Sequence, residues 1–361
     1  MAPTSLEPRL TRRSLVGAGL TLAASGAGLN AFQSSDAANG RLLFAGVNLA
    51  GGEFGSLPGS YGRDYTYPSP ADVDYYLELG FNLIRLPFRW ERLQPTLDAP
   101  FSAGDQALLA AVVGYSASRG LHVVLDTHNY ARRRVADDGW AADHLIGSKL
   151  VPTAAFADFC ARLADAFKGT PSVIFGLMNE PWGIEPEDWL VIANQAIAAL
   201  RREGASQLVL VPGIAYTGAH SWISARNTVM GDVLDPAHNF AFEVHQYFDP
   251  DSSGTSPTAV RATIGLERIE EFQRWSRENH FKAFLGEFAA GPDATSLAAL
   301  TNICRSLDAN SDVWLGWAAW AGGTWWPDDY IFTLEPSKSG RMRAQTEILA
   351  NFARHTAAKR R

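Results

Sequence analysis

Residues 173–178 read VIFGLM, and this unbroken apolar run leads directly into Asn179, Glu180 and Pro181. A strand that is apolar on both faces is typical of a parallel sheet covered by helices on both sides. Side chains that directly follow such a strand lie at its carboxyl end, where α/β folds place their binding sites. The stretch therefore predicts a parallel α/β fold with Asn179 and Glu180 at its functional edge.

Short apolar segments of this kind recur along the chain and alternate with amphipathic stretches. We predict strands at 43–48, 82–86, 122–126, 173–178, 208–211, 241–245, 283–286 and 313–318. We predict helices at 70–79, 104–119, 153–167, 187–202, 257–278, 294–308 and 343–355. Strands alternating with helices indicate βα units and a parallel sheet. Eight such units in 361 residues favour a closed (β/α)8 TIM barrel, a single domain over 39–361.

Residues 1–38 have the layout of an export signal followed by a disordered leader. Residues 11–15 read TRRSL, and the paired arginines precede an apolar run of small residues at 16–29. This arrangement predicts a twin-arginine signal peptide that is cleaved between 24 and 38. The apolar run is too short for a comfortable membrane span. We therefore expect a secreted or periplasmic protein with no membrane span in its mature form.

The composition argues against several classes of partner. The formal net charge is −7, so nothing in the overall charge attracts nucleic acid or an anionic membrane, whereas a neutral polysaccharide is compatible with it. Cys160 and Cys304 fall in predicted helices without the spacing of a metal site, and whether they pair stays open. We expect no metal, no other cofactor and a monomer.

Polar or aromatic side chains stand at the ends of six predicted strands. They are Arg85, His128, Asn129, Asn179, Glu180, His245, Tyr247, Glu287 and Trp320. In a barrel of parallel strands these ends form one mouth, where the active sites of TIM barrels lie. The predicted fold therefore gathers residues from distant parts of the chain into one site.

Glu180 and Glu287 follow the fourth and seventh strands, on roughly opposite sides of that mouth. Cleavage of a glycosidic bond uses two carboxyl groups, of which one donates a proton and the other is ionised. Tyr247 and Arg85 can donate hydrogen bonds to Glu287 and so keep it ionised. Asn179 can contact a sugar 2-hydroxyl.

His128 and His245 suit hydrogen bonds to sugar hydroxyls or orientation of the acid, and Trp320 offers a flat face for a pyranose ring. As single residues, the two histidines could equally be buried core residues. A metal site is a weaker interpretation of these histidines and glutamates, because their spacing matches no metal motif.

The motifs at these strand ends resemble glycoside hydrolase family 5, and they follow that family's order over nearly the whole mature chain. They read IRLPF at 84–88, THNY at 127–130, MNEP at 178–181, VHQYFD at 244–249, GEF at 286–288 and GWAAW at 316–320. The opening GVNLAGGEFG at 46–55 resembles a subfamily of fungal and bacterial cellulases. The resemblance implies a retaining endo-β-1,4-glucanase with Glu180 as acid and base and Glu287 as nucleophile.

Some loop residues depart from the family pattern or extend it. Arg132, Arg133 and Arg134 follow the third strand, and we expect them to pair with Asp137, Asp138 or Asp143, although they could instead favour a decorated or anionic glucan. We predict further sugar contacts from Asn129, from Trp182 on the leaving-group side, and from Trp325 or its neighbour Trp326. Trp90 could close the far end of the cleft.

Two alternatives to the endoglucanase hypothesis stay open at this point. The chain could be a mannanase, a xyloglucanase or another β-glucan hydrolase, because relatives of differing specificity share these residues. It could also be a carbohydrate-binding barrel without catalysis, although both glutamates are retained. A retaining enzyme predicts carboxyl groups about 5–5.5 Å apart, whereas an inverting enzyme separates them by roughly 6.5–9.5 Å.

Overall fold

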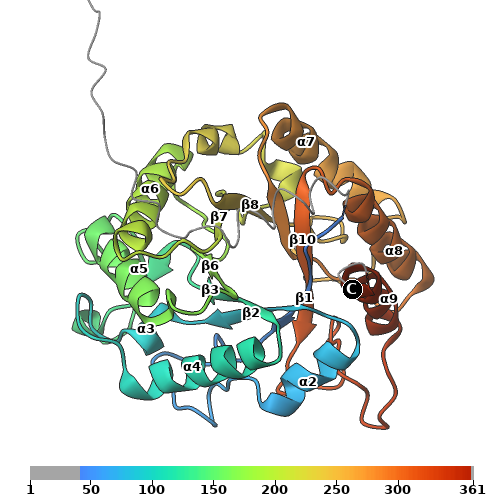
Figure 1. The fold of residues 1–361 in the computed structure, drawn as a ribbon, viewed down its shortest axis with the longest axis horizontal. Helices are drawn as coiled ribbons and strands as arrows, with labels where there is room; N and C mark the ends of the chain where they lie inside the picture. Colours follow the sequence, from blue (N-terminus) through green and yellow to red (C-terminus); the bar gives the residue numbers. More distant parts are fainter. Residues whose placement is uncertain (1–40, 359–361) are drawn as a thin grey trace, which may run out of the picture.

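Eight of the described strands form a closed ring of parallel strands, β1-β10-β9-β8-β7-β6-β3-β2 (Figure 1). The computed structural model describes residues 41–358, so the predicted signal peptide and leader at 1–38 lie outside the described residues. The strands in chain order are β1 Phe44–Leu49, β2 Leu83–Phe88, β3 His122–Thr127, β6 Val173–Gly176, β7 Val209–Pro212, β8 Phe240–His245, β9 Ala283–Glu287 and β10 Trp314–Gly322. The ring closes where β1 pairs with β10. The predicted TIM barrel is confirmed, with strand boundaries shifted by a few residues.

The helices surround the barrel, as Figure 1 shows. They are α2 Pro70–Glu78, α3 Trp90–Leu93, α4 Ala103–Ser118, α5 Thr153–Phe167, α6 Pro186–Arg202, α7 Ile264–Glu278, α8 Ala294–Ala309 and α9 Ala344–Ala358. The short elements are the strands β4 Arg132–Arg133 and β5 His144–Leu145 and the 3-10 helices η2 Ala136–Asp138, η3 Ala219–Ser221 and η4 Asn227–Asp232. Among the described residues, no helix is both long and apolar enough to cross a membrane.

One predicted helix, at 257–278, begins seven residues later than expected. The backbone before Ile264 bonds to neighbouring segments instead of to itself, because Ala259 N donates to Ser296 Oγ and Val260 N donates to Phe248 O. Those tertiary bonds replace the first helical turns. The helical pattern of the sequence could not reveal this competition, since the acceptors come from other parts of the chain.

The inward-facing side chains of the barrel change from apolar to charged along several strands, β2 and β3 among them. At the amino-terminal end, Leu83, Val124 and Phe284 belong to an apolar cluster inside the ring. Two residues further along, β2 presents Arg85 and β3 presents Asp126, both fully buried. Successive side chains of a strand alternate between the two faces, so residues two apart share one face. The apolar cluster therefore forms the floor on which the charged layer rests.

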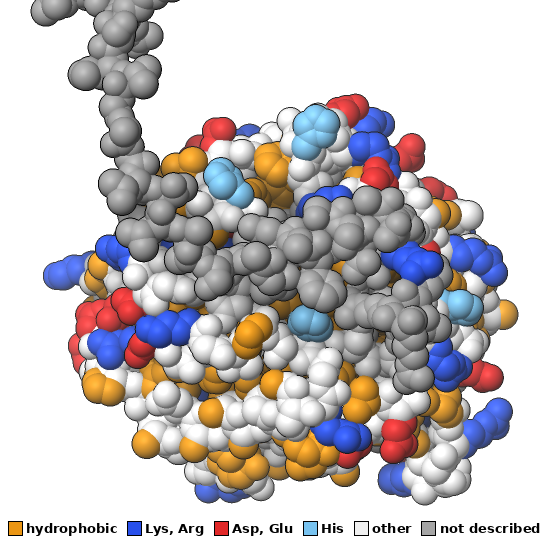
Figure 2. Space-filling model, in the orientation of Figure 1, with side chains coloured by type: hydrophobic (Ala, Val, Ile, Leu, Met, Phe, Trp, Pro, Cys, Tyr) orange, Lys and Arg blue, Asp and Glu red, His pale blue; other side chains and the backbone are white. Residues whose placement is uncertain are grey.

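The two cysteines are both free and buried. Cys160 belongs to α5 and Cys304 to α8, and Figure 1 shows these helices on opposite sides of the barrel. The question that the sequence left open is therefore settled, because the two thiols do not pair. Around the face drawn in Figure 2, acidic and basic side chains of the described residues are interspersed.

The seam between β1 and β10 depends on Gly316, which pairs with Phe44. A Cβ added to Gly316 would lie 2.2 Å from the carbonyl oxygen of Phe44. We expect Gly316→Ala to lower the free energy of unfolding by about 1–3 kcal/mol, the usual range for overpacking, in urea denaturation. Gly114→Ala on α4, where a Cβ meets open space, is the matched control and should stabilise by about 0.5–1 kcal/mol. Equal stability of the two variants would contradict this account of the seam.

Candidate active site

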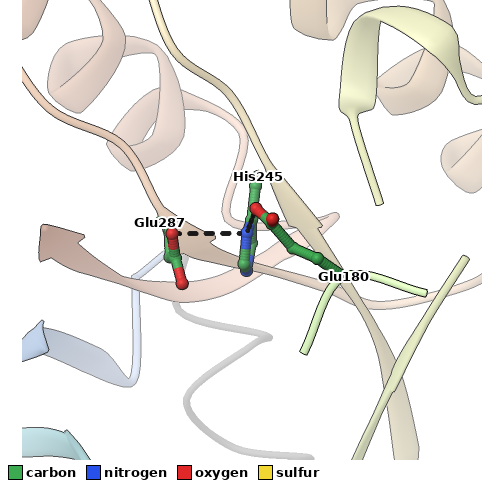
Figure 3. Close-up of side chains that lie close together, drawn as sticks. All are labelled: Glu180, His245 and Glu287. Atoms are coloured by element: carbon green, nitrogen blue, oxygen red, sulfur yellow. Dashed lines mark hydrogen bonds and ion pairs between the residues drawn. The ribbon is translucent and has the colours of Figure 1, made fainter. Parts of the chain in front are cut away.

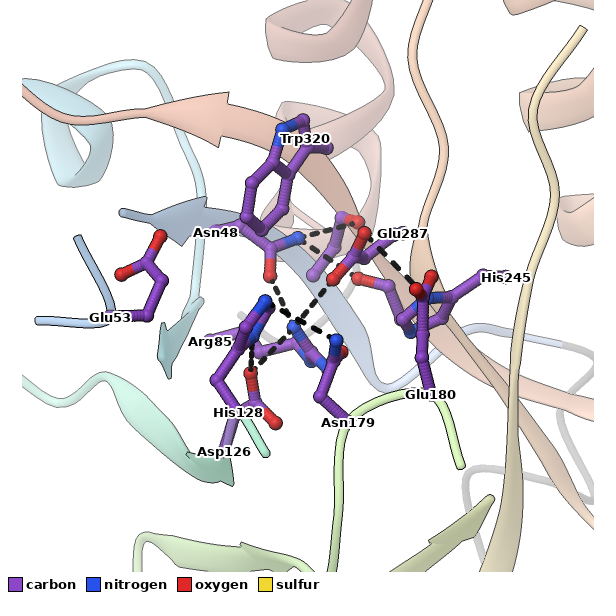
Figure 4. A network of polar contacts seen from close by, with 12 residues as sticks. Asn48, Glu53, Arg85, Asp126, His128, Asn179, Glu180, His245, Glu287 and Trp320 are labelled. Atoms are coloured by element: carbon purple, nitrogen blue, oxygen red, sulfur yellow. Dashed lines mark hydrogen bonds and ion pairs between the residues drawn. The ribbon is translucent and has the colours of Figure 1, made fainter. Parts of the chain in front are cut away.

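Arg85 on β2 is the centre of the charged layer and is completely buried. Its guanidinium nitrogens lie within 3.0 Å of oxygens on five side chains: Asn48 (2.9 Å), Asp126 (2.9 Å), Asn179 (2.8 Å), Glu243 (2.7 Å) and Glu287 (3.0 Å). Burial opposes the charge of Arg85, but the neighbouring carboxylates outweigh it and raise its pKa above the ordinary value. The guanidinium is therefore a fixed cation that joins five strands or strand ends (Figure 4).

Glu287, the last residue of β9, is held by a donor on each carboxyl oxygen. Arg85 donates to Oε1 at 3.0 Å, and the Tyr247 hydroxyl donates to Oε2 at 2.7 Å. Burial, with a contribution from the nearby Glu180, raises the pKa of Glu287 above its ordinary value, although His245 and Arg85 oppose this shift. The two donors favour the ionised carboxylate and fix its direction.

His245, the last residue of β8, lies between the two predicted catalytic glutamates (Figure 3). Its Nδ1 donates to Glu180 Oε1 at 2.7 Å and lies 3.6 Å from Glu287 Oε2. Burial lowers the pKa of His245, but the charge of Glu287, the hydrogen bond to Glu180 and the nearby carboxylate of Glu243 raise it to about 10. The imidazole is therefore charged at neutral pH and links the two carboxyl groups.

Glu180 follows β6 and has a backbone φ of 44°, in the left-handed region that residues other than glycine rarely adopt. The chain on either side is anchored, because Asn179 N donates to Thr127 O at 2.8 Å and Tyr216 N donates to Pro181 O at 3.1 Å. Unlike the buried Glu287, the Glu180 side chain keeps 16% of its surface exposed. An uncommon backbone geometry thus delivers this carboxyl group to the opening.

The two glutamates meet in one opening, as the sequence predicted. Carboxyl oxygens of Glu180 and Glu287 and a ring nitrogen of His245 all lie within 4.8 Å of one another. Glu180 and His245 also line a cavity of about 510 Å³ together with Tyr130, Tyr216, His220 and the loop at 251–253. Neither glutamate is remote from the other, and the pair has access to solvent through Glu180.

The same three side chains could in principle hold a metal ion, which the sequence reasoning set aside. A ligating imidazole must first lose the proton on its ligating nitrogen, and the raised pKa of His245 opposes that loss. Arg85 also occupies one oxygen of Glu287. The charges favour a hydrogen-bonded cluster over a cation site.

His128 and Trp320 form the next part of the site. His128 Nδ1 donates to Asp126 Oδ2 at 2.7 Å, and its ring stacks against Trp320 with centroids 5.9 Å apart. Burial lowers the pKa of His128, but Asp126 raises it above the ordinary value. Trp320 lies within β10 rather than after it, and its Nε1 donates to the Tyr330 hydroxyl at 2.8 Å.

The choice between Trp325 and Trp326 is decided by ring contacts. Trp326 stacks on Tyr330 with centroids 3.8 Å apart and meets the edge of Trp320 at 6.2 Å. Trp325 is 38% exposed in the same loop. The structure therefore joins Trp326 to the aromatic group around Trp320 and leaves the exposed Trp325 outside these ring contacts, and a sugar contact from either residue stays a prediction.

Trp182 is 40% exposed beside Glu180, on a stack of three side chains. The Arg132 guanidinium lies 3.6 Å from the centre of the Trp182 ring on one side, and Tyr216 stacks on Trp182 at 5.7 Å. Arg132 also donates to the carbonyl oxygens of Tyr130 and Trp182. These contacts fix the position of the half-exposed indole two residues after Glu180.

The predicted ion pairs of the arginine run are correct for one residue of the three. Arg134 pairs with Asp143 at 3.0 Å. Arg133 is buried and donates to the carbonyl oxygens of Gln94 and Pro95. Arg132 and Arg133 therefore bind backbone carbonyls that were not visible in the sequence, and the interpretation of a free anion-binding run finds no support.

Asn129 and Trp90 do not occupy the positions we predicted for them. Asn129 is buried, its Nδ2 donates to Glu91 Oε2 at 2.8 Å, and its Oδ1 accepts from Trp90 N at 2.9 Å. Trp90 is fully buried among core aromatic rings. Asn129 therefore anchors the start of α3 instead of contacting substrate, and Trp90 does not close the cleft.

The sequence analysis did not identify Asn48, Asp126 or Glu243, which all contact Arg85. Glu243 is buried on β8, where Oε1 accepts from Arg85 and lies 3.7 Å from His245 Nε2. A signal existed, because a carboxylate interrupts the apolar strand FAFEVH at 240–245. A buried charge inside a strand requires a partner, and that requirement could have indicated Arg85.

Comparison with known proteins agrees with this geometry. The model of the cellulase family, glycosyl hydrolase family 5, matches residues 39–323. Endoglucanase gh5-1 of Neurospora crassa is 38% identical over 83% of this chain and 74% of its own length, and endo-beta-1,4-glucanase B of Aspergillus niger is 34% identical over 85% and 89%.

Solved structures agree in fold as well as in sequence. An endo-beta-1,4-glucanase from Xanthomonas axonopodis pv. citri is 41% identical, with a TM-score of 0.83 over 88% of this chain and all of that one. XacCel5A in complex with cellopentaose is 44% identical, with a TM-score of 0.82 over 86% and 99%. The likeness therefore spans almost the whole described barrel.

The hydroxyl of Tyr247 stabilises the charge of Glu287, so its removal should make that charge harder to form. We expect Tyr247→Phe to raise the pKa of Glu287, since the donor to Oε2 is lost, in a carbon-13 NMR titration of labelled glutamate carboxyl groups. Tyr67→Phe is the control, because no described residue is hydrogen-bonded to the buried Tyr67 hydroxyl. An unchanged Glu287 titration in Tyr247→Phe would remove this role from the hydroxyl.

Proposed function

This chain belongs to the cellulase family, glycosyl hydrolase family 5, and we propose that it is a retaining endo-β-1,4-glucanase that hydrolyses internal bonds of β-glucan chains. The observation that carries the proposal is the meeting of Glu180 and Glu287. Their nearest oxygens lie within 4.8 Å. This spacing falls short of the roughly 6.5–9.5 Å that an inverting enzyme uses to place a water between its carboxyl groups.

In the first step, a carboxylate oxygen of Glu287 attacks the anomeric carbon and forms a glycosyl ester. The bond from that carbon to the leaving oxygen breaks, and Glu180 transfers its proton to that oxygen. Arg85 and Tyr247 hold Glu287 ionised for the attack. The exposure of Glu180 at the cavity suits a group that must reach the leaving sugar.

In the second step, a water molecule attacks the anomeric carbon and Glu180 takes a proton from it. The ester bond breaks, Glu287 leaves as a carboxylate, and the sugar is released with its original anomeric configuration. Glu180 is then protonated for the next cycle. The charged His245 beside both glutamates stabilises whichever of them is negative at each stage.

The other residues bind and orient the sugar. Asn179 is held by Arg85 and lies beside Glu180, in place to contact the 2-hydroxyl of the reacting sugar. Trp320, steadied by His128 and Tyr330, offers a face to a pyranose ring. The exposed indole of Trp182 serves the leaving-group side, next to Glu180.

The names of the relatives favour β-1,4-glucan as the substrate over mannan, xyloglucan or β-1,3-glucan. The similar proteins are named endoglucanases or endo-beta-1,4-glucanases, and one similar structure holds cellopentaose. The site is less compatible with a carbohydrate-binding barrel that lacks catalysis, because both glutamates and the residues that support them are retained. We further propose a monomer.

We also propose that the protein is exported by the twin-arginine route. The support is the sequence TRRSL at 11–15 followed by the apolar run at 16–29. These residues lie outside the described part of the chain. Replacing Arg12 and Arg13 with lysine should keep the precursor in the cytoplasm of an expressing bacterium, as fractionation would reveal.

The substrate and the stereochemistry can be tested together. We expect the protein to cut carboxymethylcellulose and mixed-linkage β-glucan much faster than mannan. Proton NMR of the first products from cellopentaose should reveal the β-anomer, because two displacements restore the configuration. An α-anomer as first product would contradict the retaining mechanism, and faster cleavage of mannan would favour the alternative substrate.

The roles of the two glutamates can be separated with azide. Glu180→Ala should slow cellulose hydrolysis by roughly 10²–10⁴-fold. With 2,4-dinitrophenyl cellobioside, whose leaving group needs no proton, azide should restore turnover and yield β-cellobiosyl azide through the Glu287 ester. Glu287→Ala forms no ester, so azide should yield the α-azide. The opposite pair of products would exchange the two assignments.

A further inference from the structure

Glu53, in the loop after β1, lies at the opposite end of the polar group from Glu180 (Figure 4). Its Oε2 accepts a hydrogen bond from Gly51 N at 2.8 Å. Its Oε1 is buried, and no described residue donates to it. Burying a carboxyl oxygen without a donor is unfavourable. The hydrogen bond from Gly51 satisfies only Oε2, so it does not explain why Oε1 is buried.

A second unpartnered polar atom lies in the aromatic group next to Glu53. Trp326 is held between Phe54, whose ring meets it at 4.6 Å, and Tyr330. Trp326 Nε1 is buried, and no described residue accepts from it. The loop that carries Glu53 and Phe54 and the loop that carries Trp326 therefore present one free acceptor and one free donor. Sugar hydroxyls can satisfy both, since each is a donor and an acceptor.

The direction of the bound chain follows from the proposed function, on which this inference rests. Glu180 protonates the leaving oxygen, so the leaving part of the glucan occupies the cavity that Glu180 lines with Tyr216 and His220. The retained part must then extend past Trp320 in the other direction. Figure 4 shows Glu53 on that side of Trp320 and Glu287.

We propose that Glu53 is a substrate-binding residue for the non-reducing side of the glucan, where Oε1 accepts a hydrogen bond from a hydroxyl of a sugar beyond the reacting one. Trp326 Nε1 donates to the same part of the chain. The two contacts join the loops after β1 and β10 through the substrate. They contribute binding energy remote from the reacting bond, which an enzyme can use to position that bond.

The raised pKa of Glu53 is consistent with a carboxylate that lacks one hydrogen-bond donor. Burial raises the pKa of Glu53 to about 7, and the charge of His128 and the Gly51 N–H only partly oppose this. Asp126 raises it further. A sugar hydroxyl that donates to Oε1 would favour the ionised form.

Glu335 provides a contrast that separates substrate binding from loop anchoring. It is also a largely buried carboxyl group in a loop near the barrel mouth, but its Oε1 accepts from Gly323 N at 2.7 Å and from the Tyr76 hydroxyl at 3.0 Å. Burial raises the pKa of Glu335 as well. Glu335 joins the loop after β10 to α2, and its partners are all within the protein.

The test measures how much each added sugar on the non-reducing side improves catalysis. The substrates are the 4-nitrophenyl β-glycosides of glucose, cellobiose and cellotriose, which share a leaving group. In the wild type, kcat/KM should rise at each step. In Glu53→Ala, one of the two rises should be smaller by roughly 10- to 100-fold, the usual effect of losing a hydrogen bond to a charged group.

Two further variants keep the test decisive if Glu53→Ala folds poorly. Glu53→Gln keeps the shape and loses the charge, and Trp326→Phe keeps a ring and loses the N–H, so each should reduce the same rise by a smaller factor. Glu335→Gln is the matched control and should lower the melting temperature while both rises stay as in the wild type. If Glu53 had only a structural role, its replacement would instead lower kcat/KM by the same factor for all three substrates, and both rises would stay unchanged.

The outcomes are distinguishable from failure of the proposed function. Hydrolysis of carboxymethylcellulose by the wild type tests that function without reference to Glu53. If the wild type is active and the Glu53 and Trp326 variants keep both rises unchanged, the inference about Glu53 is wrong while the endoglucanase assignment stands.

Discussion

The buried guanidinium of Arg85 is the constraint on which the rest of the site depends. A charge without water is tolerable only with close partners of opposite sign, and three carboxylates lie within 3.0 Å of Arg85. Because each carboxylate comes from a different strand, their ion pairs also set the relative positions of β3, β8 and β9. Removing Arg85 would leave these three buried carboxylates without their shared cation, so fold and chemistry depend on the same residues.

Space for that charged layer is provided by small residues on the same face of the barrel. A Cβ on Gly286 would lie 2.1 Å from Glu243 Oε1, and Asn48 Nδ2 donates to the Gly286 carbonyl at 2.9 Å. The residue just before Glu287 therefore has no side chain because Glu243 occupies the space. This arrangement ties the direction of Glu287 to a carboxylate on the neighbouring strand.

The opening is asymmetric about the two glutamates. On the Glu180 side it has a cavity lined mainly by polar side chains, among them Tyr216, on which the exposed Trp182 stacks. On the other side it has the closely packed aromatic group around Trp326 and the carboxyl group of Glu53. The packed aromatic group favours fixed positions for the sugars that stay bound to the enzyme. The cavity on the Glu180 side suits release of the leaving-group sugars. The two sides thus correspond to the two parts of the cleaved glucan, one that stays bound through Glu287 and one that is released.

The sequence by itself determined the barrel, its strand ends and the pair Glu180 and Glu287, because apolar periodicity and strand-end position are local properties of the chain. Only the tertiary structure decided that Asn129 faces α3, that Trp326 rather than Trp325 joins Trp320, and that Glu243 completes the partners of Arg85. Those outcomes depend on which donors and acceptors meet across strands far apart in sequence. Such pairings follow from three-dimensional packing and leave no periodic trace in the order of residues.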